Sequence, residues 1–281
     1  MTQQILLAHE PVIRLGAFFG IFALMAVLEL AAPRRPQKVA RLQRWPSNIG
    51  IVMLDTLLAR LVFPTTAVGL ALLGESKGFG LLNAFGAAPW LAIPLGVILL
   101  DFAIYLQHVL VHAVPALWRL HRMHHADLEF DVTTGARFHP IEILLSMALK
   151  LMVIAALGPP AVAVLIFEVL LNGTAMFNHS NVRIPTGLDR MLRLIVVTPD
   201  MHRVHHSIVP RETNANFGFN LPWWDRLFGT YRDQPMAGHE AMTIGIDTFR
   251  DPAEQRLDRM LTQPFREGDR SYSFGRREPA E

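Results

Sequence analysis

The sequence predicts an all-α fold, an integral-membrane helical bundle with a histidine-rich helical cap on the cytoplasmic side. Its 281 residues are 51% hydrophobic and only 18% charged, which is more apolar than an ordinary soluble domain. Four apolar stretches reach the length of about 20 residues that a helix needs to cross a bilayer. Ten of the twelve histidines lie between positions 108 and 206, close to the ends of these stretches.

The apolar stretches define the expected spans in chain order. They cover residues 12–32, 49–73, 89–111 and 141–177, and the last is long enough for two passes. The sequence GPP at 158–160 predicts the apex of a helical hairpin inside the last stretch, because tandem prolines interrupt a helix and glycine permits the turn. The first stretch has no basic segment before it and no small-residue cleavage site after it, so we expect it to be retained as a span.

Basic loop residues predict the orientation of the spans. The loop PRRPQKVARLQR at 33–44 is strongly cationic, whereas the loop at 74–88 carries one lysine and one glutamate. Short basic loops stay in the cytoplasm. When the chain is threaded from that loop, every histidine group emerges on the cytoplasmic side of the membrane.

The absence of cysteine limits the chemistry of the chain. Disulfides, thiolate zinc sites, iron–sulfur clusters and thiolate-ligated haem are excluded, so any metal must be held by nitrogen or oxygen. The basic residues lie beside apolar spans without interleaved stacking aromatics. This placement favours contact with anionic lipid headgroups and argues against nucleic-acid binding.

The histidines fall into groups with helical spacing. One group is an HxxxH pair and two are HxxHH trios, whose members lie three and four residues apart on one helix face and can point into one volume. Thr198 as N-cap and Pro199 as first helical residue predict a helix that begins just before the second trio. Two more histidines stand singly between the trios. The groups are His108/His112, His121/His124/His125, His139, His179 and His202/His205/His206.

The number and type of these side chains predict a centre with two metal ions. Imidazole suits iron, zinc, copper or nickel, and one ion cannot use nine or ten ligands. A neutral, nitrogen-rich shell favours redox chemistry with O2 over water activation. A metal-free structural or pH-sensing cluster is the alternative, but it would bury many imidazoles whose joint protonation is severely unfavourable. We interpret the lone His9 and His239 as ordinary core or surface residues.

The motifs HVLVH, HRMHH, NHSN and HRVHH, followed by WDRLFGTY, together resemble the fatty acid hydroxylase/sterol desaturase superfamily of integral-membrane non-haem di-iron oxygenases. The resemblance covers about residues 95–235, the expected catalytic core. It implies a membrane-embedded, fatty acid hydroxylase-like domain over 1–235. We expect a cytoplasmic C-terminal tail over 236–281, loosely held in its final stretch.

The resemblance also implies the metal ligands. Some relatives have a further histidine four residues before the one that matches His179, and Ala175 stands at that position here. His139, in RFHPIE, could replace the missing ligand or act as a donor behind the ligands. The implied ligands are His108, His112, His121, His124, His125, His179, His202, His205 and His206, with His139 as a tenth candidate.

Acidic residues near the spans could support these ligands, because a metal-bound histidine commonly donates its other N–H to a carboxylate or a carbonyl. Asp101 lies nearly two helical turns before His108 on the same face, so Asp101 or Tyr105 could contact the ligands from behind. Glu168 lies inside the hairpin, where a carboxylate is costly unless it is paired or hydrated. The further candidates, for which a local cap or salt bridge is the simpler interpretation, are Asp127, Asp200 and Asp225.

The resemblance implies an oxidoreductase that uses two iron ions, O2 and external electrons to hydroxylate a C–H bond of a lipid, such as a fatty acyl chain or a sterol. A lipid desaturase or an ether-lipid monooxygenase would use the same site. Two alternatives belong to other classes: a zinc-dependent membrane hydrolase, which would need no O2, and a non-catalytic protein stabilised by metal.

The chain shows no nicotinamide, flavin or haem fingerprint, so we expect electrons from a separate NAD(P)H-linked reductase or ferredoxin. We expect a multi-pass protein of a bacterial inner membrane with its metal site on the cytoplasmic side. The sequence leaves the oligomeric state open.

Overall fold

The computed structural model describes residues 3–268, which form helices joined by loops and two isolated β-bridges. The predicted all-α fold is confirmed over these residues. Five helical segments among them are long and apolar enough to cross a membrane. The long helices are α2 (Glu10–Ala31), α3 (Arg41–Val62), α4 (Ala67–Lys77), α6 (Pro89–Ala113), α8 (Pro140–Leu157) and α9 (Ala161–Asn178).

Shorter helices connect and cap the long ones. At the N-terminal end of the molecule these are α1 (Gln3–Ala8) and α5 (Leu81–Ala84). The remaining short elements are α7 (Pro115–His125), η1 (Thr134–Ala136), α10 (Thr186–Leu192), α11 (Pro199–His205), α12 (Pro210–Thr213), α13 (Trp223–Phe228), α14 (Gly238–Ala241), η2 (Pro252–Gln255), α15 (Leu257–Met260) and η3 (Gln263–Phe265).

The second predicted span differs from expectation. The sequence predicts one helix over 49–73, but the structure ends α3 at Val62 and begins α4 at Ala67. Pro64 lies in the break, where its ring and missing N–H prevent the helix from continuing. The Thr66 side chain then accepts a hydrogen bond from Gly69 N and caps the start of α4.

The predicted hairpin over 141–177 is present as α8 and α9. Gly158 ends α8 in the left-handed conformation, with φ of 59°, and Pro160 precedes the first residue of α9. A side chain at Gly158 would place its Cβ 2.6 Å from Phe79 O, so this position requires glycine for space as well as for conformation. The turn thereby packs directly on the loop after α4.

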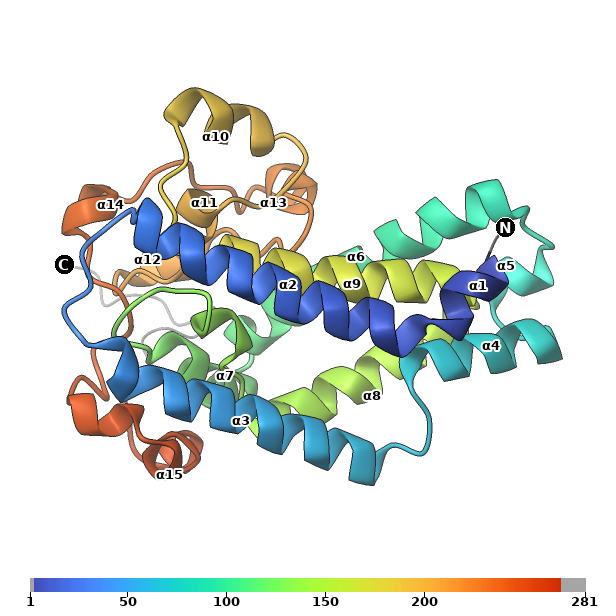
Figure 1. The fold of residues 1–281 in the computed structure, drawn as a ribbon, viewed down its shortest axis with the longest axis horizontal. Helices are drawn as coiled ribbons and strands as arrows, with labels where there is room; N and C mark the ends of the chain where they lie inside the picture. The colour runs from blue at the N-terminus through green and yellow to red at the C-terminus, as the bar shows by residue number, and fades with distance from the viewer. Residues whose placement is uncertain (1–2, 269–281) are drawn as a thin grey trace.

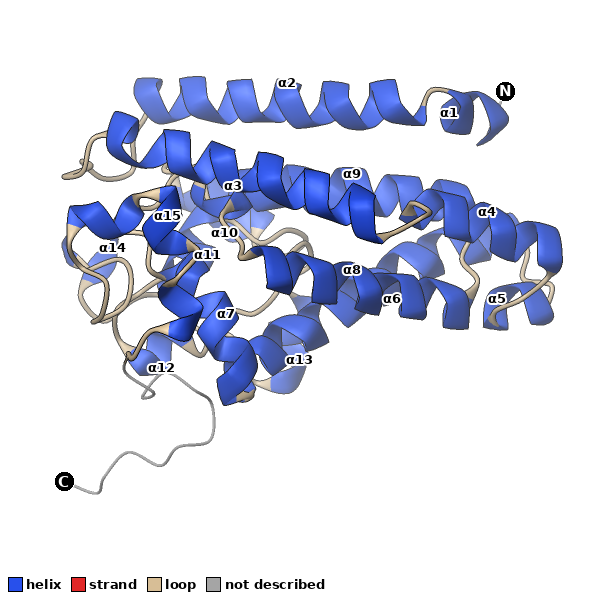
Figure 2. Ribbon diagram, turned by 90° about the horizontal axis from the view of Figure 1, so that it is seen from below, coloured by secondary structure: helices blue, strands red, loops and turns tan. Residues whose placement is uncertain are grey.

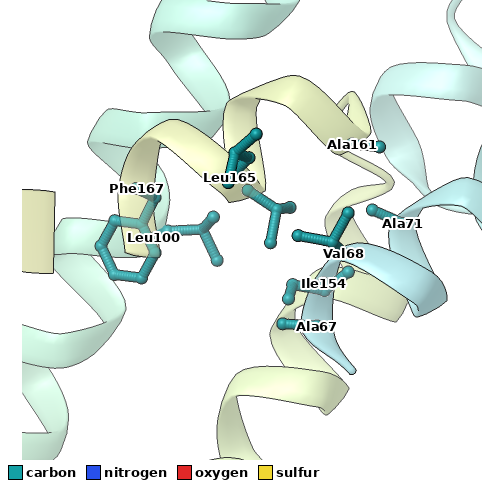
Figure 3. Close-up of a cluster of buried hydrophobic side chains, with 9 residues drawn as sticks. Ala67, Val68, Ala71, Leu100, Ile154, Ala161, Leu165 and Phe167 are labelled. Carbon is teal, nitrogen blue, oxygen red and sulfur yellow. The ribbon is translucent and has the colours of Figure 1, made fainter. Parts of the chain in front are cut away.

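A buried cluster joins α4, α6, α8 and α9 (Figure 3). Leu100, Leu165 and Phe167 supply its bulk, while Ala67, Ala71 and Ala161 allow the helices to approach closely. Between membrane helices such packing must supply the stabilisation, because lipid tails are as apolar as leucine and no hydrophobic effect drives the helices together.

The long helices run along the long axis of the molecule (Figure 1). The N-terminus, α1, α4 and α5 lie at one end, and α7, α11 and α14 lie toward the other, which we call the site end. All groups of the histidine motifs therefore share one end, as the threading predicts. That this end faces the cytoplasm remains a prediction.

The segment 252–266, which contains α15, packs along the site end (Figure 2). Arg119 and Arg122 of α7 donate to carbonyl groups of Gln263, Pro264 and Arg266, and α15 packs against α3. Part of the region predicted as a tail thus contacts the histidine-bearing helix α7. The predicted loose stretch from 266 onward lies mostly outside the described residues.

Candidate metal centre

Nine histidines converge into two adjoining groups at the site end. Within each group, one ring nitrogen from every member lies within 4.8 Å of the others, and all nine side chains are buried. The group of five consists of His108, His112, His121, His125 and His205, and the group of four consists of His124, His179, His202 and His206.

Helical geometry distributes the motif residues between the groups. In α7, His121 and His125 are four residues apart and point into the group of five, while His124 points into the group of four. The second trio divides in the opposite sense, with His202 and His206 in the group of four and His205 in the group of five. As predicted, α11 begins with Pro199, and the Thr198 side chain accepts a hydrogen bond from Met201 N. Each trio therefore serves both groups. The rings of His125 and His206 stack at the boundary, with centroids 4.5 Å apart.

Hydrogen bonds donated by Nδ1–H groups orient most of these rings. The Nδ1 atoms of His108, His179 and His205 each lie 2.8 Å from a carbonyl oxygen, those of Phe217, Ala175 and Ala215 respectively. His121 Nδ1 lies 2.7 Å from Glu142 Oε1. An Nδ1–H that donates to these acceptors leaves the Nε2 lone pair directed into the group, which is the tautomer that binds a metal.

In the group of five, every Nε2 atom lacks a hydrogen-bond partner among the described residues. Nε2 of His108, His112, His121 and His205 is buried and unpaired, and both ring nitrogens of His125 and His206 are unpaired. In the group of four, His179 Nε2 lies 3.2 Å from His124 Nε2 and 3.1 Å from His202 Nε2. Buried polar atoms that are left unpaired are costly, so lone pairs gathered in this way fit a bound cation.

Burial keeps the imidazoles neutral. It lowers the pKa of His179 and of His205 to about 3, and it lowers the pKa of His124, His125, His202 and His206 well below the usual value. A neutral imidazole offers its lone pair without first losing a proton. The donor set of the two groups is nine imidazole nitrogens, which suits a first-row transition metal such as iron.

Aromatic side chains enclose the two groups. The Phe138 ring stacks on His124 with centroids 4.4 Å apart, and Phe130 lies 5.1 Å from His206. Phe217 and Trp118 lie 5.1 and 4.9 Å from the His112 ring. This shell excludes bulk water from the space around the ligand atoms.

His139 lies outside both groups. Its Nδ1 accepts a hydrogen bond from Ile141 N at the start of α8, and its Nε2 lies 3.3 Å from Leu261 O. Both ring nitrogens are therefore engaged away from the centre. Ala175, at the position where some relatives carry another histidine, contributes its carbonyl oxygen to orient His179.

The acidic candidates occupy supporting positions. Asp101 accepts hydrogen bonds from Trp224 Nε1 and Asn220 N, and the Tyr105 hydroxyl contacts Thr230 Oγ1, so their hydrogen bonds lead to the segment 220–230. Asp225 accepts from Phe217 N and Gly218 N, both at 2.8 Å, and thereby holds the carbonyl group that orients His108.

The other acidic candidates form ion pairs, which for Asp127 and Asp200 is the simpler interpretation of the sequence. Arg44 pairs with Asp127 at 2.6 Å, and although burial raises the pKa of Asp127, Arg44 and Arg137 lower it to about 2. Asp200 pairs with Arg34 at 3.0 Å. Glu168 pairs with Lys150 at 2.7 Å and with Arg14 at 3.2 Å, which supplies the partners that a carboxylate inside a span requires.

Sequence reasoning missed the carboxylate that contacts one of the nine histidines directly. Glu142, in the first turn of α8, is the group that accepts from His121. Its signal in the sequence is weak, because a glutamate three residues after a possible N-cap usually serves only the helix start.

Comparison with known proteins identifies the family. Residues 93–230 match the family model of fatty acid hydroxylases. Residues 93–230 belong to the fatty acid hydroxylase family. This range contains all nine histidines of the two groups.

Among similar curated proteins, an ornithine lipid hydroxylase from Rhizobium tropici is 34% identical over 66% of this chain. The alkylglycerol monooxygenase of Homo sapiens is 30% identical over 57% of it, and the cholesterol 25-hydroxylase of Rattus norvegicus is 26% identical over 57%. The chain spans 54%, 34% and 52% of the lengths of these three fatty acid hydroxylase relatives. No solved structure matches the chain at a significant level.

Proposed function

We propose that this protein is a membrane-bound, non-haem di-iron oxygenase that uses O2 and external electrons to hydroxylate a C–H bond of a lipid. The observation that carries the proposal is the pair of adjoining nitrogen-only groups, with five and four histidines. Membership of the fatty acid hydroxylase family supports it. A hydrolytic zinc site fits less well, because hydrolytic two-metal sites usually recruit carboxylate ligands and the two groups consist of histidines alone.

The residues of the chain have distinct parts in this function. The nine histidines hold two iron ions, which supply the redox chemistry with O2 when bound. Glu142 and the carbonyl groups of Ala175, Ala215 and Phe217 fix the tautomers and orientations of four of the ligands. The aromatic shell excludes water, and water would otherwise compete with the lipid for the reactive space.

A lipid substrate suits the position of the centre. His108 and His112 lie in the last two turns of α6, a helix long and apolar enough to span, so the ligands begin where the span ends. A lipid that moves sideways between helices brings an apolar carbon to this level without leaving the bilayer. The named activities of the relatives, on an ornithine lipid and on cholesterol, also concern lipids.

Hydroxylation beside an ether oxygen is a second candidate for the same site. Four of the similar curated proteins are alkylglycerol monooxygenases. Oxidation at that carbon gives a product that breaks down and releases the chain. Either substrate would present a C–H bond to the same pair of histidine groups.

Electrons come from a separate NAD(P)H-linked reductase or ferredoxin in this proposal. The protein lies in a bacterial inner membrane with the site end on the cytoplasmic side, where soluble reductants are available. The strongly basic loop after the first span supports this orientation.

The test combines metal analysis with an oxygen-dependent assay. Purified protein should contain about two iron ions per chain, and with a reductase, NAD(P)H and O2 it should add oxygen to extracted bacterial lipids, as detected by mass spectrometry. The His202→Ala variant is the matched control without activity. Lipid turnover that persists without O2 and requires zinc would instead establish the hydrolase, and loss of iron without any loss of turnover would disprove the di-iron proposal.

A further inference from the structure

The surface outside the spans carries a continuous apolar face. In and just after α10, the exposed side chains include Leu188, Met191, Leu194 and Ile195. In α13 they are Trp223, Leu227 and Phe228, and all seven are between 43% and 70% exposed. We call residues 188–195 and 223–228 the apolar collar. An exposed apolar surface of this kind marks an interaction site in a folded protein.

The two parts of the apolar collar are fixed to one another. Trp223 Nε1 donates to Leu194 O at 2.7 Å, and Arg226 Nη2 donates to Arg193 O at 3.2 Å. Arg193 also pairs with Asp189 at 2.6 Å, which holds the helix α10 against the chain that follows it. The apolar collar is therefore a rigid surface, and its two segments expose their leucines together.

The apolar collar continues the lipid-facing surface of a span. The Phe228 ring lies 5.9 Å from Phe102 and 5.6 Å from Tyr105 of α6, and Trp224 lies 4.7 Å from Phe102. The same stretch of α6 exposes Leu106 and Leu110. Along the long axis of the molecule, α10 and α13 lie level with the site-end half of α2 and not beyond it (Figure 1).

Charge on the apolar collar also suits a membrane surface. The carboxylates of Asp189 and Asp225 are buried and face inward, whereas Arg190 and Arg226 are exposed. Basic and aromatic residues around an apolar face are typical of elements that lie in the interface of a bilayer with anionic lipids.

We propose that the apolar collar inserts into the leaflet at the site end, with Leu194, Ile195 and Leu227 among the acyl chains and Arg190 and Arg226 near the headgroup phosphates. The inserted helix α13 also carries Asp225, which holds Phe217 and thereby His108. Insertion thus fixes the depth of the histidine groups, so that acyl carbons near the headgroup come level with them. The proposal requires only that the spans cross a bilayer, and a failure of the hydroxylase function would leave it intact.

Spin labels test the proposal directly, because the chain has no cysteine and each introduced cysteine is unique. Ile195→Cys and Leu227→Cys report on the apolar collar. Met53→Cys, 69% exposed on the span α3, is the lipid control, and Met236→Cys, 80% exposed before α14, is the solvent control. Each labelled protein is placed in nanodiscs of phosphatidylcholine and phosphatidylglycerol. Power-saturation electron paramagnetic resonance then measures its accessibility to O2 and to a water-soluble nickel chelate.

Collar labels should match the Met53 label, with high O2 and low nickel accessibility. Collar labels that match the Met236 label would overturn the proposal and place the apolar collar in water. Labels shielded from both reagents and broadened by a second label would also overturn it, since they would show that another copy of the chain covers this face. Quenching of Trp223 by brominated lipids, measured as the difference from the Trp223→Phe variant, provides an independent readout that needs no cysteine.

Discussion

At the scale of single residues, the contact between His121 Nδ1 and Glu142 Oε1 links a ligand to a carboxylate 21 positions away in the chain. We predict that Glu142→Ala weakens iron binding by about 10- to 100-fold, because the ring loses the acceptor that fixes its tautomer. Competition with a chelator measures the affinity. Glu142→Gln keeps an acceptor oxygen and should lose much less, and equal losses in both variants would contradict this role.

The division of the histidines into two groups has a consequence for single substitutions. His179→Ala should lower the iron content toward one ion per chain, because it removes a member of the group of four and leaves the group of five intact. His139→Ala should keep both ions, since its ring nitrogens contact Ile141 and Leu261. Elemental analysis of the purified variants gives the ratio. A loss of iron in the His139 variant would instead make that histidine a ligand.

The carboxylate of Asp225 organises the loop behind His108. Asp225→Asn replaces one acceptor oxygen with a donor, so one of the N–H groups of Phe217 and Gly218 loses its partner. A buried unpaired group costs about 1–3 kcal/mol, and thermal unfolding should show a corresponding loss. Asp233→Asn is the matched control, because the Asp233 side chain is 67% exposed and can form hydrogen bonds with water instead. A variant as stable as that control would rule out the structural role of Asp225.

At the scale of elements, the turn between α8 and α9 sets how the far end of the bundle packs. Gly158→Ala should destabilise the protein by about 2–4 kcal/mol, because a left-handed alanine is strained and its Cβ meets Phe79 O. Gly20→Ala in α2, where a Cβ meets nothing within 4 Å, is the control. Unfolding in mixed detergent measures both. Equal stability of the two variants would show that the turn tolerates a side chain.

The helix α7 shows how one element serves two purposes. One face carries the three histidines of its motif, and two arginines between and before them, Arg119 and Arg122, hold the segment 263–266. The spacing of the histidines predicts the first purpose. Nothing in the local sequence predicts the second, because the acceptors are backbone carbonyl groups about 140 residues away.

At the scale of the whole molecule, bound iron should act as a cross-link. The nine proposed ligands come from α6, α7, the end of α9 and α11, so metal binding would tie together segments that lie far apart in the chain. Removal of iron with a chelator should lower the unfolding temperature, and restored iron at about 100 times its dissociation constant should add back about 2.7 kcal/mol. Calorimetry of both forms measures the change, and identical unfolding curves would contradict it.

The sequence by itself determined the helical class, the hairpin at Gly158 and the eight converging histidines of the pair and the two trios, because each depends on local rules of length, turn chemistry and helical spacing. The resemblance to the family added His179. The prediction of a single helix over 49–73 was wrong. Hydropathy averaged over a window of residues does not detect the break that Pro64 introduces between α3 and α4.

Only the tertiary structure decided which histidine belongs to which group, that His139 lies apart and that Glu142 orients His121. It also decided where the apolar residues of α10 and α13 lie relative to the spans. The physical reason is common to all of these. They depend on how separate helices pack against one another, and spacing within one helix fixes a face but not what that face meets.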